Sequence, residues 1–105
     1  MRQITEQSVR AFLNAEKFNK SNMSVEVEPN VTVLKYQGNA IAYKYNDTEG
    51  TISITNCGWE SNTTKERLNG VILLSGVNIK PIYQKNFVWY LDGKQWDGEL
   101  IDLIK

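Results

Sequence analysis

The sequence predicts a single α+β domain in which two helices pack on an antiparallel sheet. The length of 105 residues suits one hydrophobic core. Two stretches have the apolar spacing of amphipathic helices, and several short β-rich segments are separated by turn residues. The expected order along residues 1–105 is therefore helix, β-meander, helix and β-hairpins, without a linker or an internal repeat.

The first helix is expected from about Thr5 to Phe18. Val9, Phe12 and Leu13 have i, i+3, i+4 spacing and would form one apolar face. The polar run at 19–22 contains turn formers and should end the helix.

Four β-rich segments follow the first helix. They are residues 25–27, 31–36, 40–45 and 51–55. Gly38-Asn39 separates the second from the third, and the polar stretch 46–50 separates the third from the fourth. Consecutive antiparallel strands are the simplest interpretation of such short connections.

The second helix is expected to begin at Thr63. Thr63 and Glu66 fit a capping box, in which each side chain bonds the other residue's backbone amide. Leu68 would face the core and Glu66 the solvent. The helix could end at Gly70 or at Gly76, because both glycines suit a helix end, and we prefer the later one.

Two hairpins are expected after the second helix. Residues 77–83 and 86–91 would pair through a turn at Gln84-Lys85, and Pro81 would confine the first of these strands to a sheet edge or a bulge. The apolar tail at 100–104 is compatible with either a last strand or a short helix.

Asp92-Gly93 is a strong signal for a two-residue hairpin turn. Such a turn would make Trp89 and Trp96 cross-strand neighbours, because they lie three residues before and three residues after it. A large separation of the two indoles would contradict this hairpin.

The composition excludes several classes of chemistry. The chain has no histidine, so a Ser-His-Asp triad, a Cys-His pair and an imidazole metal ligand are impossible. Its lone Cys57 excludes an intrachain disulfide. We expect no enzyme activity, no cofactor and no metal site.

Charge and hydropathy narrow the expected partners. Twelve basic and twelve acidic residues cancel, so any contact with nucleic acid must be local. No run of about 18 apolar residues suggests a membrane span. The start of the chain lacks the apolar core of a signal peptide, which predicts an intracellular protein with no membrane partner.

The opening of the second helix is the main candidate site. Helix N-termini carry unpaired N–H groups and a partial positive charge, which suit a phosphate or a carboxylate. The candidate residues here are Ser61, Asn62, Thr63, Thr64, Lys65 and Arg67. The simpler interpretation is a capped helix whose Lys65 and Arg67 are solvated, because such caps are common. Lys65 and Arg67 lie ~200° apart around the helix, so a ligand would have to straddle the helix end.

Aromatic side chains on strands offer a second candidate surface, because exposed rings can stack on unpaired bases. Most aromatic residues are needed for the core of so small a domain. The residues that we single out for stacking are Tyr43, Tyr45 and Tyr90.

A group of acidic residues lies near the end of the chain. Its members are Asp92, Asp97, Glu99 and Asp102. Acids in turns are usually solvated, so a docking patch for a basic partner surface is a better interpretation than a metal site.

Several motifs together resemble a known family. They are Ala11-Phe12-Leu13-Asn14, Gly38-Asn39-Ala40-Ile41-Ala42-Tyr43, Cys57-Gly58-Trp59, the stretch 63–69 and the stretch 88–98. The pattern is similar to a family of small uncharacterised proteins encoded by tailed bacteriophages and prophages. The resemblance covers nearly the whole chain and implies a setting, the cytoplasm of a bacterial host, rather than a mechanism.

Two functions of different classes fit these observations. The first is a non-enzymatic phage accessory protein that binds nucleic acid or a nucleotide phosphate at the opening of the second helix. The alternative is a protein-binding inhibitor or modulator of a host enzyme or of an anti-phage defence system. The helix opening favours the first, and the balanced charge favours the second.

Overall fold

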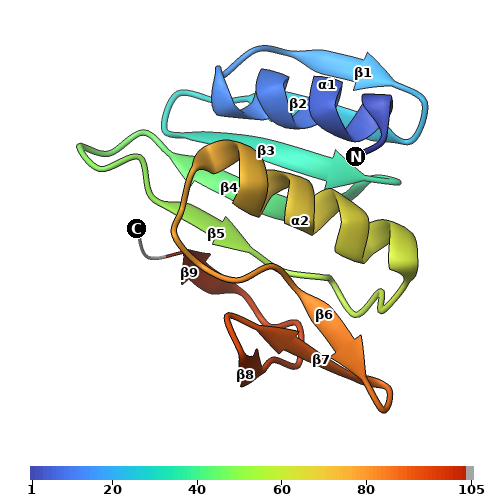
Figure 1. Cartoon of the computed structure of the whole chain (residues 1–105). Coiled ribbons are helices and arrows are strands. Elements are labelled where there is room, and N and C mark those ends of the chain that lie inside the picture. The colour runs from blue at the N-terminus through green and yellow to red at the C-terminus, as the bar shows by residue number, and fades with distance from the viewer. Residues whose placement is uncertain (104–105) are drawn as a thin grey trace.

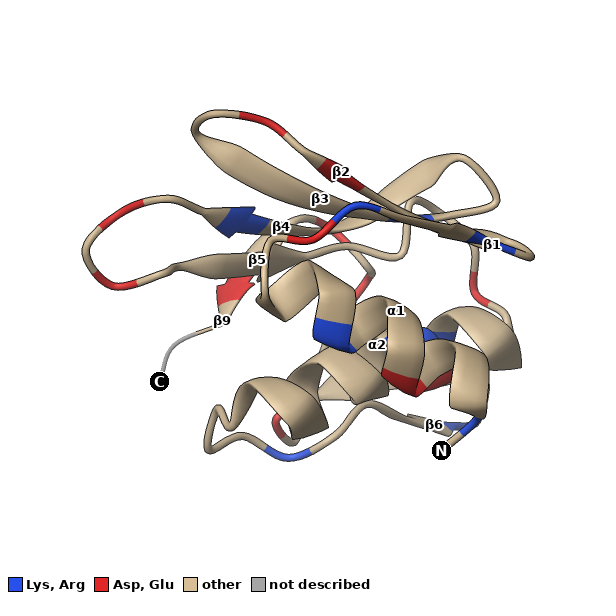
Figure 2. Cartoon of the chain, turned by 90° about the horizontal axis from the view of Figure 1, so that it is seen from above, with Lys and Arg blue, Asp and Glu red and all other residues tan. Residues whose placement is uncertain are grey.

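The computed structural model describes residues 1–103 and confirms the α+β class. Figure 1 shows the helices and sheets, and Figure 2 shows that both helices lie on one side of the larger sheet. The helices are α1 (Gln3–Leu13) and α2 (Asn62–Ser75). The strands are β1 (Phe18–Lys20), β2 (Met23–Val27), β3 (Val31–Tyr36), β4 (Asn39–Tyr45), β5 (Ile52–Ile54), β6 (Tyr83–Lys85), β7 (Val88–Leu91), β8 (Lys94–Gln95) and β9 (Ile101–Leu103).

Helix α1 is shorter than predicted. It ends at Leu13, and Ala15 then takes a left-handed conformation with φ 54°. Phe18 starts β1 and pairs with Val25 of β2, so the prediction of helix through Phe18 is wrong. The apolar face is as expected, because Val9 and Phe12 are fully buried.

The six-stranded sheet has the order β1-β2-β3-β4-β5-β9. Its strands β2 to β5 form the predicted antiparallel meander, and β9 pairs antiparallel with β5. The apolar tail therefore forms a strand as far as Leu103, while Ile104 lies outside the described residues. Leu34, Ala42 and Ile54 line up across three strands and belong to the core.

Helix α2 begins one residue earlier than predicted and has a different cap. The Ser61 hydroxyl accepts a hydrogen bond from the Thr64 amide at 3.1 Å, so Ser61 is the N-cap and the Thr63–Glu66 capping box is wrong. The preferred end at Gly76 is confirmed by its left-handed φ of 77°. Leu68 is buried as expected, but Glu66 is half-buried rather than exposed.

The three-stranded sheet β6-β7-β8 packs against α2. The Asn69 side chain donates to the Ile82 carbonyl at 2.9 Å and accepts from the Ile82 amide at 2.6 Å. The first hairpin turns at Asn86-Phe87, and the expected turn at Gln84-Lys85 is wrong because both of those residues belong to β6. Both turn residues are left-handed, with φ of 52° and 66°, as a type I′ turn requires, and asparagine adopts that conformation more readily than glutamine does.

The predicted Asp92-Gly93 turn is confirmed. Both residues are left-handed, with φ of 52° and 78°. The ring centroids of Trp89 and Trp96 lie 6.3 Å apart, and the Trp96 amide donates to the Trp89 carbonyl at 2.9 Å. The register follows directly from the length of the turn.

Replacing Gly93 with valine should destabilise the protein by about 1 to 3 kcal/mol, because a β-branched residue is strained at a left-handed φ. Urea denaturation measures this loss. Gln84→Val, at an exposed strand position, is the matched control and should change stability little. Equal denaturation midpoints for the parent and the Gly93 variant would contradict the prediction.

Candidate functional site

The opening of α2 is largely occupied by its own hydrogen bonds. Ser61 accepts from the Thr64 amide through its hydroxyl and from the Lys65 amide through its carbonyl, at 3.1 Å in both cases. The Thr64 side chain is buried and bonds the Ser61 hydroxyl at 2.9 Å. Asn62 is exposed and Thr63 is half-buried. The amides of Thr64 and Lys65 are therefore already satisfied within the protein.

Arg67 is not a solvated cation, and the expectation that it would be is wrong. Its side chain is only 2 % exposed. One terminal nitrogen, Nη1, donates to Thr5 Oγ1 and to Glu66 Oε1, both at 2.6 Å. The guanidinium carbon lies 5.8 Å from the centroid of the Tyr36 ring. Arg67 thus joins α2 to α1 and to the main sheet.

The carboxylate of Glu66 is held in the ionised form. Its partial burial opposes ionisation, but the hydrogen bonds from Thr5, from the Arg2 amide and from Arg67 outweigh this effect and keep the pKa of Glu66 below its ordinary value. Thr5 of α1 links the two charged residues of α2, because its hydroxyl donates to Glu66 and accepts from Arg67. These three residues, which we call the Arg67 cluster, connect α1 to α2.

Lys65 lies on another side of α2 from Arg67. Its ammonium nitrogen is 6.0 Å from the centroid of the Trp89 ring, so it covers a core residue of the three-stranded sheet. The two cations of the predicted anion site therefore do not converge on one ligand position.

The aromatic candidates form two separate stacks. Tyr43 and Tyr45 have ring centroids 6.4 Å apart and an interplanar angle of 12°. Tyr43 pairs with Val33, and the alternation from core residue Ala42 places it on the sheet face that the helices do not cover (Figure 2). Tyr90 instead stacks on Tyr83 in the three-stranded sheet, with centroids 5.1 Å apart.

The sequence interpretation missed Phe87, the most exposed large apolar residue among residues 1–103. It occupies the second position of the β6–β7 turn, with φ 66° and 91 % exposure. Tyr83, at the end of β6 away from this turn, is 45 % exposed. Asn86 was the available signal, because asparagine is typical of a left-handed turn position.

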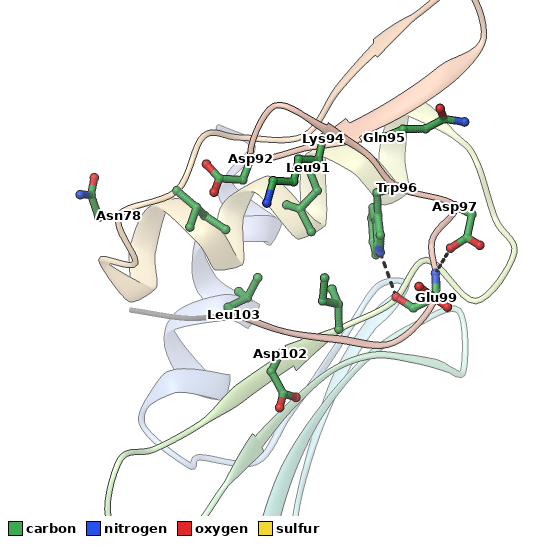
Figure 3. A pocket seen from close by; sticks show the side chains of 12 residues that line it. Asn78, Leu91, Asp92, Lys94, Gln95, Trp96, Asp97, Glu99, Asp102 and Leu103 are labelled. Carbon is green, nitrogen blue, oxygen red and sulfur yellow. Dashed lines mark hydrogen bonds between the residues drawn. The ribbon is translucent and has the colours of Figure 1, made fainter.

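A groove of about 880 Å³ separates β8 from β9, and we call it the β8–β9 groove (Figure 3). The residues that line it are Asn78, Ile79, Leu91, Asp92, Lys94, Gln95, Trp96, Asp97, Glu99, Ile101, Asp102 and Leu103. The fold therefore brings together at one cavity all four members of the acidic group identified in the sequence. Within residues 1–103, no three histidine, cysteine or carboxylate side chains are grouped as metal ligands.

Comparison with protein families gives a match over nearly the whole chain. The model of the Kyanoviridae Gp96 protein family matches residues 1–102. The chain belongs to this family. The resemblance to small proteins of tailed phages is thereby confirmed, since the Kyanoviridae are tailed phages.

No curated protein and no solved structure matches this Kyanoviridae Gp96 family member. The family description names no activity, ligand or partner. Among the described residues, neither helix combines the length and the apolar character needed to cross a membrane.

Proposed function

We propose that this phage protein is a non-enzymatic binding protein that anchors a protein partner at the tip of the β6–β7 hairpin. The observation that carries the proposal is the conformation and exposure of Phe87. A phenylalanine is strained at a left-handed φ, and its exposed ring gains nothing from burial within the chain. A residue that serves neither local geometry nor the core is a candidate for contact with another molecule.

A second aromatic feature of the same hairpin supports a protein partner. Tyr83 and Tyr90 form a stacked pair at the end of the hairpin opposite Phe87. Exposed aromatic side chains with few rotatable bonds are typical of the residues that dominate protein–protein binding energy. In a phage protein, such a partner is a host enzyme or an anti-phage defence protein, whose activity the binding would modulate in the bacterial cytoplasm.

Nucleic-acid binding is the second candidate, and the Tyr43–Tyr45 stack favours it. Two nearly parallel rings on an uncovered sheet face can stack on unpaired bases. The opening of α2 gives it less support, because Arg67 is buried and paired. A phosphate could still contact the other residues of this opening, Ser61, Asn62, Thr63 and Lys65. These residues lie on a different surface from the two tyrosines.

Replacing Phe87 with glycine tests the first candidate. Glycine accepts a left-handed φ, so the variant should fold at least as stably as the parent while losing the ring. In affinity capture, the immobilised parent protein should retain a protein partner from a host lysate treated with nuclease. Phe87→Gly should retain it at least ~10-fold less, because loss of a central aromatic contact costs about 2 kcal/mol or more of binding.

The double variant Tyr43→Ala, Tyr45→Ala is the matched control for this capture. It should retain the protein partner as the parent does. Undiminished capture by the Phe87 variant would overturn the hairpin as the anchor. If nuclease treatment abolishes capture by the parent, and the double tyrosine variant captures nothing from an untreated lysate, nucleic-acid binding would instead be established.

A further inference from the structure

The β8–β9 groove has apolar walls that come from both sheets. Leu91 belongs to β7 of the three-stranded sheet, and Trp96 directly follows β8. Leu103 belongs to β9 of the main sheet (Figure 3). Ile101, two residues before Leu103 on β9, also lines the groove and is 38 % exposed. The apolar lining therefore reaches the solvent at Ile101.

The rim of the groove is strongly acidic. Four carboxylates and one lysine, Lys94, lie among the described lining residues. Asp92 and Asp97 each use one oxygen to accept a backbone amide, from Lys80 and from Glu99, at 3.0 Å in both cases. Within residues 1–103, the other carboxylate oxygen of each residue accepts no hydrogen bond. This rim favours a cationic occupant.

The other two lining carboxylates, Glu99 and Asp102, differ in their contacts. The Glu99 carboxylate is exposed and has no hydrogen bond or ion pair within the described chain, although its carbonyl accepts from Trp96 Nε1 at 3.0 Å. Asp102 bonds the Ser53 hydroxyl and points away from Leu91 and Trp96 (Figure 3). Glu99 is therefore the rim carboxylate that no internal contact requires.

The groove also borders an unpaired sheet edge. Strand β9 is the last strand of the six-stranded sheet, and in the described part of the chain only β5 pairs with it. Strand β8 is likewise an edge of the smaller sheet. An unpaired edge offers backbone N–H and C=O groups to an added strand.

We propose that the β8–β9 groove binds an extended, basic segment of a partner protein, added as a strand along the outer edge of β9. This inference rests on the proposed protein-binding function and names the chemistry of the partner. An extended peptide meets all three features at once: its backbone pairs with the edge, its apolar side chains enter the groove, and its lysines or arginines meet the acidic rim. A small amine would use only the charge.

The probe is a capped synthetic peptide of alternating lysine and valine, titrated into the parent protein by calorimetry at low salt. The amide signals of β9 and the Trp96 indole signal should shift in a nuclear magnetic resonance titration. Binding should weaken as salt is added, because the rim is exposed. A peptide of alternating glutamate and valine should not bind.

Two comparisons separate strand addition from charge alone. A lysine–valine peptide with N-methylated valines has the same charge but fewer backbone donors, and it should bind at least ~10-fold more weakly. Glu99→Lys should weaken binding of the unmodified peptide by about 10-fold, because it replaces attraction to the lysines of the peptide with repulsion. Glu28→Lys, an equal charge reversal in the exposed β2–β3 turn, should not weaken it.

Equal binding of the N-methylated peptide would overturn strand addition. Unchanged affinity in Glu99→Lys, with an unchanged melting temperature, would overturn the groove as the site, and so would failure of the basic peptide to bind at all. None of these results depends on Phe87. The capture experiment with Phe87→Gly can therefore fail or succeed independently of this titration.

Discussion

Replacing Arg67 with alanine should destabilise the protein by about 2 to 4 kcal/mol, because it removes a buried side chain with its hydrogen bonds and leaves a half-buried carboxylate without its cation. The variant removes a side chain that is almost completely buried and leaves Glu66 without its cation. It also removes the donor to Thr5 Oγ1, so the contact between α1 and α2 loses its polar centre. Urea denaturation measures the change in unfolding free energy.

Arg10 provides the matched control for this prediction. It pairs with Glu6 on the surface of α1 at 3.1 Å, with both side chains at least half exposed. Arg10→Ala should therefore cost only a few tenths of a kcal/mol. Similar losses for the two arginine variants would show that the Arg67 cluster contributes no more than a surface pair.

The same cluster predicts a dependence of stability on pH. Because the pKa of Glu66 is lowered in the folded state, its contribution is fully present above the ordinary glutamate pKa and is lost as the pH falls through the lowered value. In Glu66→Gln this part of the acid dependence should disappear. An acid transition identical to that of the parent would contradict this assignment.

Replacing Gly98 with alanine should cost roughly 2 to 5 kcal/mol, from backbone strain and overpacking together. Gly98 has φ 90°, and a Cβ atom there would lie 2.1 to 2.2 Å from three side-chain atoms of Asn56. Asn56 is buried and accepts from the Gly58 amide at 2.8 Å, so it cannot easily move away. The Gly98 carbonyl also holds the Thr55 hydroxyl at 2.7 Å.

Gly38→Ala separates strain from overpacking. Gly38 has φ 80°, but a Cβ atom there would meet nothing within 4 Å, so only the strain should remain. Gly98→Ala should also cost less in an Asn56→Ala background, because the obstructing atoms are gone. Equal melting temperatures for the Gly98 and Gly38 variants would contradict the prediction, because they would show that the Asn56 side chain moves to make room for the new Cβ atom.

Local signals in the sequence were enough for most of the fold. The length of the Asp92-Gly93 turn determined the pairing of Trp89 with Trp96, and Gly76 correctly ended α2. The end of α1 was missed because no glycine or proline stands between Leu13 and Phe18 to mark it, while the pairing of Phe18 with Val25 depends on a strand formed later in the chain. Such tertiary pairing overrides local propensity.

The candidate site was harder to predict. Periodicity correctly separated Lys65 from Arg67 around α2, but it could not reveal that Thr5 and Glu66 bury the Arg67 guanidinium, because Thr5 is far away in the sequence. In contrast, the acidic group near the end of the chain was recognised from its sequence spacing. The apolar walls that turn this group into a groove appear only when two sheets meet.

The pairing of β9 with β5 has a consequence for how the protein forms during synthesis. Ser53 and Asp102, which face each other across this pair, are 49 residues apart, whereas β2 to β5 pair with their immediate neighbours along the chain. The meander can therefore assemble on the ribosome while the edge of β5, with its Ile-Ser-Ile sequence, is still uncovered. Until β9 emerges, the edge of β5 can pair with another nascent chain. The pairing of β9 with β5 then removes this route to aggregation.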